Sequence, residues 1–504
     1  MLQSQKVALN IKVSKIGEIG RRPIAHRPFV KMLRIQASNV ACQVHHSGEY
    51  FRGTFGYLVL LGRGNSTLAI RCGMCTIDPS IKGVVMQHWF IPALVMALMV
   101  SPEALTYVGN AMGLLGFNAV WSLLVALLIS LLTWRSYRVL ATQFTAPYDE
   151  FTGLRAVFGA VPAITLPLCS RVVVWVCAGT LSLASAGYLF NEVFVLWFPN
   201  LLFSFCLLGS ILFLNLMGPR VAERFQVLCV TLALAGLLIF VVLGLFTPAP
   251  EASSATEAYI PPELMRLSAW LTIVWLFVGV DFALWHRDES GDQNLLPAKS
   301  VNLGMVIGAV VLSLWGLTAI AFAPMAKLAE TSVPHMVMAR LMYGQTGRMI
   351  MGAVAILGSA GAVNALLLSV ARMLSHMGAQ QALPAVLKRL PVALAILAIG
   401  PAAMMALGYA GETITPELTK AGLMFWLLLH LAVHTAAHRL QQREAHEALR
   451  GRALPMIGAL LLGLYVVGWI GVDPMRGTVL SAMLAMGVGV AILSAIWLWL
   501  RPLP

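Results

Sequence analysis

Long apolar segments follow one another along the chain from residue 87 to residue 501, separated by polar or proline-containing seams. In a helix, about 20 apolar residues rising 1.5 Å each cross the ~30 Å hydrocarbon layer of a bilayer. In lipid the backbone must satisfy its own hydrogen bonds, which favours helices. The pattern predicts an all-α integral membrane protein with twelve transmembrane helices.

We expect these helices at residues 87–116, 117–139, 157–187, 193–217, 225–247, 266–286, 302–325, 349–376, 391–410, 419–438, 454–472 and 477–500. Composition agrees with this prediction. The chain is 59% hydrophobic and only 11% charged, with a mean hydropathy of +0.82, whereas soluble domains are about 25% charged.

The net charge of +13 is distributed as a membrane protein distributes it, so it does not indicate a nucleic-acid partner. With both termini cytoplasmic, 15 of the Lys and Arg residues after position 86 lie inside and six outside, and Arg171 lies within a span. The seam 248–265 has no Lys or Arg and three Glu, so it is expected outside. This positive-inside bias predicts a multi-pass protein of the plasma membrane, in bacteria the inner membrane.

Residues 1–86 differ from the twelve-helix domain predicted over residues 87–504. This basic N-terminal extension carries 12 Lys and Arg and has no long apolar segment or signal-peptide pattern. It is expected to be a disordered cytoplasmic tail, or not to be translated if synthesis starts at Met74 or Met86. Either alternative makes it dispensable for insertion and transport.

Two of the predicted helices are interrupted. The first meets Ser101-Pro102-Glu103 mid-span, and the sixth contains Gly279 and Asp281 within apolar sequence. Proline removes a backbone donor, and a carboxylate in lipid must face protein or water. Paired interruptions at corresponding positions in two halves of a chain are typical of a transporter's midplane site.

Such breaks have a specific chemistry. They expose N–H groups at one half-helix end, which suit a carboxylate, and C=O groups at the other, which suit an ammonium. Two breaks face to face would bind a small zwitterion or amine. The substrate-binding residues expected there are Ser101, Pro102, Glu103, Trp275, Phe277, Gly279 and Asp281.

The sixth helix resembles that of the amino acid–polyamine–organocation (APC) superfamily of permeases. Residues 275–281, WLFVGVD, are similar to the family's pattern of aromatic residues, glycine and an acidic residue. Three other stretches resemble family motifs at Asn215, Gly218 and Gln226, at Glu289, Asn294 and Pro297, and at Asn364, Arg372, Leu383 and Pro384.

The resemblance covers residues 87–501 and implies a LeuT-type 5+5 inverted repeat, with discontinuous helices 1 and 6 and two peripheral helices. The first helix departs from the family, which usually breaks at a glycine-rich cluster. Residues 96–102, MALMVSP, contain no glycine.

Arg171 is expected near the midplane of the third helix, where a guanidinium requires a carboxylate or a water-filled cavity. Asp281 and Glu103 are the candidate partners. Arg171 would be either part of a structural ion pair or a group in the pathway that responds to protons or substrate.

The sequence offers two alternatives for the coupling ion, sodium and the proton. Ser359 and Asn364 offer oxygens to a sodium ion, although small polar residues also pack helices together. The fifth helix has no Lys or Arg between residues 225 and 247 to replace a sodium ion. Protonation of Asp281 or Glu103 is the alternative, and proton coupling or exchange is slightly favoured over sodium.

His430, His434 and His438 follow one another at i, i+4 and i+8 on one helix face. About 12 Å separates the outer two along the helix, so one metal ion cannot bind both, and interhelical hydrogen bonds are favoured. The sequence has no nucleotide-binding, HExxH or GxSxG motif. No cofactor, metal or enzymatic activity is expected.

The sequence thus predicts a secondary active transporter of an amino acid or related amine, working by alternating access. Its partners would be that small molecule, a coupling proton or sodium ion, and membrane lipids. A non-transporting membrane sensor with the same fold and an integral-membrane enzyme are the alternatives.

Overall fold

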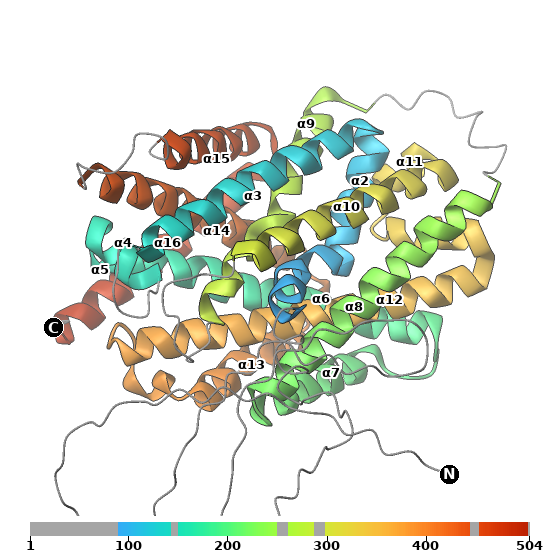
Figure 1. The fold of residues 1–504 in the computed structure, drawn as a ribbon. Coiled ribbons are helices and arrows are strands. Elements are labelled where there is room, and N and C mark those ends of the chain that lie inside the picture. The colour runs from blue at the N-terminus through green and yellow to red at the C-terminus, as the bar shows by residue number, and fades with distance from the viewer. Residues whose placement is uncertain (1–88, 143–149, 249–260, 287–297, 444–452, 502–504) are drawn as a thin grey trace, which may run out of the picture. The chain divides into compact units, whose positions relative to one another are not determined.

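The computed structural model describes residues 89–142, 150–248, 261–286, 298–443 and 453–501. In these ranges the chain forms helices joined by short turns (Figure 1). Nine of the described helices are long and apolar enough to cross a membrane, and two more apolar helices are shorter. The chain is therefore a multi-pass membrane protein. The twelve-span count and the inverted repeat stay predictions, and the extension at residues 1–86 lies outside the described residues.

The first half of the chain begins with a helix at residues 89–96. There follow η1 (Leu98–Val100), α2 (Pro102–Leu115), α3 (Asn118–Thr142), α4 (Glu150–Phe158), α5 (Ala160–Pro167), η2 (Leu168–Val172), α6 (Val173–Val193), α7 (Asn200–Leu216) and α8 (Pro219–Phe246).

The second half contains α9 (Glu263–Thr272), η4 (Ile273–Trp285), α10 (Ala298–Phe322), α11 (Met325–Glu330), α12 (Pro334–Ala379), η5 (Ala385–Lys388), α13 (Leu390–Ala406), η6 (Tyr409–Gly411), α14 (Ile414–Arg443), α15 (Ala453–Val472) and α16 (Arg476–Leu500). Within α12 the backbone bends at Tyr343 and Gly344, which have non-helical angles.

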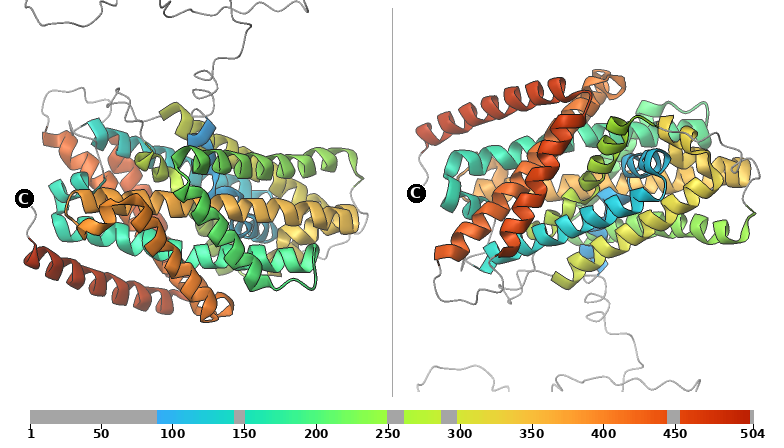
Figure 2. Two further views of the ribbon diagram at one scale, coloured as in Figure 1. Left: turned by 90° about the horizontal axis from the view of Figure 1, so that it is seen from below. Right: turned by 90° about the horizontal axis from the view of Figure 1, so that it is seen from above.

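The helix α12 lies at the centre of the bundle and α16 at its edge. The most apolar window of α12 is 83% buried, and the helix packs along α6 and α8. The corresponding window of α16 is only 11% buried. Both views of Figure 2 show α16, the darkest red helix, along one edge. A helix that is apolar all round but barely buried by protein has lipid as its partner.

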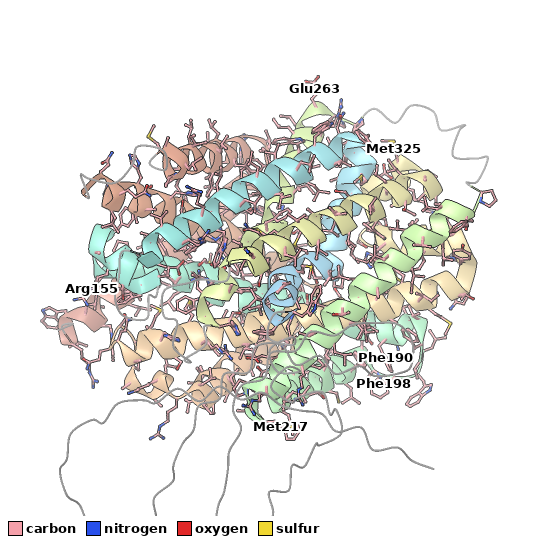
Figure 3. All side chains as sticks on the ribbon, in the orientation of Figure 1. Arg155, Phe190, Phe198, Met217, Glu263 and Met325 are labelled. Atoms are coloured by element: carbon pink, nitrogen blue, oxygen red, sulfur yellow. The ribbon has the colours of Figure 1, made fainter. Side chains whose placement is uncertain are left out.

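The segment α4–α6 crosses the bundle. Figure 3 shows Arg155 of α4 on the opposite side from Phe190 and Phe198, whose rings meet 5.5 Å apart where α6 leads into α7. Midway, Pro167 lacks an N–H, and over Leu168–Val172 the chain adopts the wider π-helical pattern. Single π-turns within α-helices are frequent at functional sites, and this one contains Arg171.

The sixth expected helix differs from its prediction. The segment has no extended break at Gly279. Instead α9 passes at Ile273 into a 3₁₀ helix that continues to Trp285, and all thirteen of its residues are buried. The helix therefore changes its hydrogen-bond pattern without unwinding. Long 3₁₀ runs are uncommon because their hydrogen-bond geometry is poorer.

Candidate functional site

The first helix is broken where the sequence places the break. After the helix at 89–96 and the short η1, Ser101 adopts an extended conformation, with φ −69° and ψ 156°. Its hydroxyl accepts a hydrogen bond from Ala104 N at 3.2 Å, and Pro102 occupies the first helical position of α2. Proline is favoured there because its missing N–H needs no partner.

The broken first helix contacts the sixth helix directly. A Cβ added at Gly279 would lie 3.1 Å from Cδ1 of Leu98, in η1. On the other side, a Cβ at Gly358 of α12 would lie 2.0 Å from the carbonyl oxygen of Val100. Both glycines thus permit the close approach of neighbouring helices to the break.

Glu103 follows the break on α2 and turns toward α6. Its Oε2 accepts a hydrogen bond from the Ser182 hydroxyl at 2.8 Å. The carboxylate also lies beside the Ser101 hydroxyl and its own backbone N–H. Oε1 is buried and has no hydrogen-bond partner among the described residues.

Arg171 is fully buried between two carboxylates. Nη1 and Nη2 donate to Glu150 Oε2 and Oε1 at 2.5 and 2.9 Å, and Nε donates to Asp281 Oδ2 at 3.0 Å. Nη2 also contacts Asp281. Bidentate pairing of this kind fixes the guanidinium plane. Glu150, the first residue of α4, is itself 1% exposed.

Aromatic and histidine side chains complete this cluster. Trp426 Nε1 donates to Asp281 Oδ2 at 3.0 Å, and the Tyr137 hydroxyl donates to Glu150 at 2.5 Å. His430 Nε2 lies 3.7 Å from Asp281 Oδ2. We call Glu150, Arg171 and Asp281 the charged triad. It holds two carboxyl groups for one guanidinium and so carries one excess negative charge when both carboxyl groups are ionised and His430 is neutral.

Of the two candidate partners expected for Arg171, the structure shows one. Asp281 is a partner as predicted, whereas Glu103 bonds Ser182 and the second partner is Glu150. Ser182 lies eleven residues beyond Arg171 in sequence, roughly 16 Å of helical rise. Glu150 lies between the helices expected at residues 117–139 and 157–187, where no local pattern distinguishes it from a surface carboxylate.

The polar residues singled out by family resemblance form a buried hydrogen-bond chain. Asn215 donates to Asn364 Oδ1 at 2.7 Å, Asn364 donates to Gln226 Oε1 at 2.8 Å, and Gln226 donates to the Ala93 carbonyl at 3.4 Å. This chain connects α7, α12, α8 and the first helix. It gives Asn364 an evident structural role.

Ser359 differs from Asn364. It is fully buried, and its hydroxyl has no hydrogen-bond partner among the described residues. It follows Gly358, which packs on the carbonyl of Val100. The hydroxyl is therefore the better placed of the two predicted ion ligands.

The three spaced histidines have separate surroundings. His434 bonds the Thr133 and Ser136 hydroxyls at 3.0 and 2.8 Å, an interhelical contact of the kind expected. His438 bonds Gln442 at 2.9 Å. His430 faces the charged triad and, with Phe277, lines a small pocket. Sequence reasoning did not assign His430 to the site.

A larger cavity of about 470 Å³ opens among α2, α9 and the ends of α14, α15 and α16. Tyr107 and Trp275 line it, with ring centroids 6.0 Å apart in an edge-to-face arrangement. The cavity also contains the ion pair of Lys420 with Asp473, at 3.3 Å, and Arg476. We call this cavity the vestibule, and Trp275 joins it to the sixth helix.

Residues 89–493 match the amino acid permease family, which is part of the APC superfamily. A search of curated proteins returned no match. The fold is similar to that of the Eremococcus coleocola manganese transporter bound to an aromatic bis-isothiourea compound, with a TM-score of 0.55 and 14% identity over 83% of this chain and 96% of that one. A variant of the same transporter has a TM-score of 0.57 and 15% identity, over 86% and 98% of the two chains.

Proposed function

Because the chain belongs to the amino acid permease family, we propose that it is a secondary active transporter of a small amine-bearing molecule. One observation carries the proposal. The extended residue Ser101 interrupts the first helix within the bundle, and the adjoining η1 packs against Gly279 of the sixth helix. A break of this kind, buried in protein, is how transporters form a midplane site.

Alternating access requires opposite ends of the site to open in turn. The vestibule reaches Trp275 from one side, while the charged triad and Trp426 connect α4, η2, η4 and α14 beyond it. We infer that the triad helps to close the other side. Opening there would require the contacts of Arg171 to rearrange.

We further propose coupling to protons, or exchange of one substrate for another. The triad has one more carboxylate than guanidinium, and His430 lies beside Asp281. A proton bound within this cluster would remove the excess charge, which is costly in a low-dielectric interior.

Uptake into proteoliposomes tests the proposal. Purified protein is reconstituted, and uptake of radiolabelled amino acids and amines is measured against protein-free vesicles. Gly279→Val should abolish uptake because its side chain meets Leu98 and the Phe282 ring, both within 3.1 Å of the Cβ position. Gly489→Val on α16 is the matched control, since nothing lies within 4 Å of its Cβ position.

One outcome would reject transport, and another would reject the proposed role of the helix contact. Uptake equal to that of empty vesicles, with ligand binding retained, would favour the non-transporting sensor. Equal uptake by Gly279→Val and wild type would show that the contact between the two helices is not part of the pathway.

A further inference from the structure

We propose that Glu103 is the anchor of the substrate and that the substrate is a cationic amine on an apolar body, without a carboxylate group. The inference rests on the proposed transport function and names the substrate class of the same site. Most of the buried charged and polar groups near the break are already paired within the protein. The groups left unpaired indicate which charge the substrate carries.

The N–H groups at the N-terminus of α2 already have partners within the protein. A helix N-terminus binds a substrate carboxylate through free N–H groups and the helix dipole. Here Pro102 has no N–H, and the Ser101 hydroxyl caps Ala104 N. The carboxylate of Glu103 lies beside the remaining N–H, its own. A substrate carboxylate arriving at this point would compete with the Glu103 carboxyl group for the same N–H.

The buried guanidiniums are also engaged. Arg171 is held by Glu150 and Asp281. Arg372 lies 3.6 Å from Glu223, and it bonds the Trp285 carbonyl at 3.3 Å and His286 at 2.5 Å. Neither is available to a substrate carboxylate without breaking a charged contact inside the protein.

The groups that remain unpaired favour a ligand that is positively charged and donates hydrogen bonds. Among the described residues, buried carboxylate oxygens without a hydrogen-bond partner occur at Glu103 and Asp281. Asp281 is fully buried and already shared by Arg171 and Trp426. Glu103 has only hydroxyl and N–H neighbours, and an ammonium would supply the charge it lacks.

The vestibule, one helical turn from Glu103 along α2, also suits an amine. Tyr107 lies four residues after Glu103, one turn along α2 on the same face, and it lines the vestibule with Trp275. Trp275 is 3% exposed, and its indole nitrogen has no partner among the described residues. Aromatic faces attract ammonium groups. The apolar vestibule walls, such as Leu114 and Leu264, suit a hydrocarbon body. The two cations of the vestibule are engaged, since Lys420 pairs with Asp473 and Arg476 donates to the Gly471 carbonyl at 2.7 Å.

A metal cation fits these residues less well. In the described part of the chain, no group of three or more His, Cys, Asp and Glu residues is placed to hold a metal ion. Divalent cations require several oxygen or nitrogen ligands, whereas an ammonium needs only three acceptors. Glu103, Ser101 and Ser182 supply acceptors of that kind.

Matched ligand pairs test the proposal. Thermal stabilisation and equilibrium binding are measured on the purified full chain in detergent. The probes are tyramine against tyrosine, cadaverine against lysine, and MnCl₂. We expect the amine of at least one pair to bind at least tenfold more tightly than its amino acid. Glu103→Gln should weaken that binding by on the order of ten- to a hundredfold, the loss of one charged hydrogen bond.

Two further variants separate binding from folding. Glu103→Asp keeps the charge and should retain more affinity than Glu103→Gln. Glu412→Gln, at an exposed position after η6, is the matched control and should bind as wild type does. If Glu103→Gln does not fold, Ser182→Ala and Glu103→Asp must each weaken amine binding.

Several outcomes would overturn the inference. These are tighter binding of the amino acid in both pairs, binding of MnCl₂ but not of the amines, no binding of either amine, or undiminished amine affinity in Glu103→Gln. Proteoliposome uptake separates this result from the proposed function. Uptake of tyrosine or lysine without their amines would reject the anchor and keep the transporter. Amine binding that depends on Glu103 without any uptake would reject transport alone.

Discussion

Arg171 and Glu150 lie 21 residues apart in sequence, yet the Arg171 guanidinium donates hydrogen bonds to both carboxylate oxygens of Glu150, at 2.5 and 2.9 Å. The same guanidinium reaches Asp281 across the bundle. One cation thus holds three helical segments together through two buried carboxylates.

Removing either carboxylate of the triad should have a modest effect, and removing both a large one. Glu150→Gln and Asp281→Asn each leave a neutral ion pair and should lower stability by about 1–3 kcal/mol. The double variant leaves an unpaired buried guanidinium, which costs about 3–5 kcal/mol more. Apparent thermal unfolding midpoints of the four proteins in one detergent measure this coupling. Strictly additive shifts would show that the two carboxylates act independently.

Asp281→Asn should reduce transport sharply while expression and membrane insertion persist. The substitution removes the charge that connects the sixth helix to Arg171 and leaves an amide beside His430. We expect at least a tenfold lower initial rate of uptake. Wild-type kinetics with unchanged pH dependence would exclude Asp281 from the mechanism.

Trp275→Ala should weaken apparent substrate affinity. The ring extends from the sixth helix, lines the vestibule and meets Tyr107 edge to face. Loss of a cation–π contact predicts a KM higher by about two- to thirtyfold. Trp275→Phe retains an aromatic face and should fall between the two proteins. A lower KM in the alanine variant would contradict a role in binding.

A pH gradient, not a sodium gradient, should drive uptake. The Ser359 hydroxyl, which has no hydrogen-bond partner among the described residues, would contradict this expectation if it bound sodium. Ser359→Ala should therefore leave uptake within about twofold of wild type, since a proton-coupled cycle needs no ligand there. Sodium-stimulated uptake that is lost in Ser359→Ala would assign the hydroxyl to a sodium site.

Topology can be tested at two exposed positions, one at each end of a long helix. In a background without native cysteines, Glu412→Cys should react with an impermeant thiol reagent from outside the cell. Gln442→Cys, near the end of α14, should react only after the membrane is opened. The distribution of Lys and Arg is the basis of this expectation. Reversed accessibility would invert the orientation.

Much of the candidate site could be located from the sequence. Pro102 mid-span and the charges at Glu103, Arg171 and Asp281 are visible there because lipid makes each of them exceptional. Glu150 and Ser182 were not found, since nothing in a polar seam or an apolar helix marks which residue faces a charge. His430 was visible, but its nearness to Asp281 depends on how α14 packs on the sixth helix.

The sequence by itself determined that this chain crosses the membrane repeatedly as helices and that the first helix breaks at Ser101. Both follow from local chemistry, namely the apolar length that a bilayer requires and the backbone donor that proline lacks. Only the tertiary structure decided that the sixth helix tightens into a 3₁₀ helix and that Arg171 pairs with Glu150. These depend on contacts between distant segments, whose energies are set by packing that no local pattern encodes.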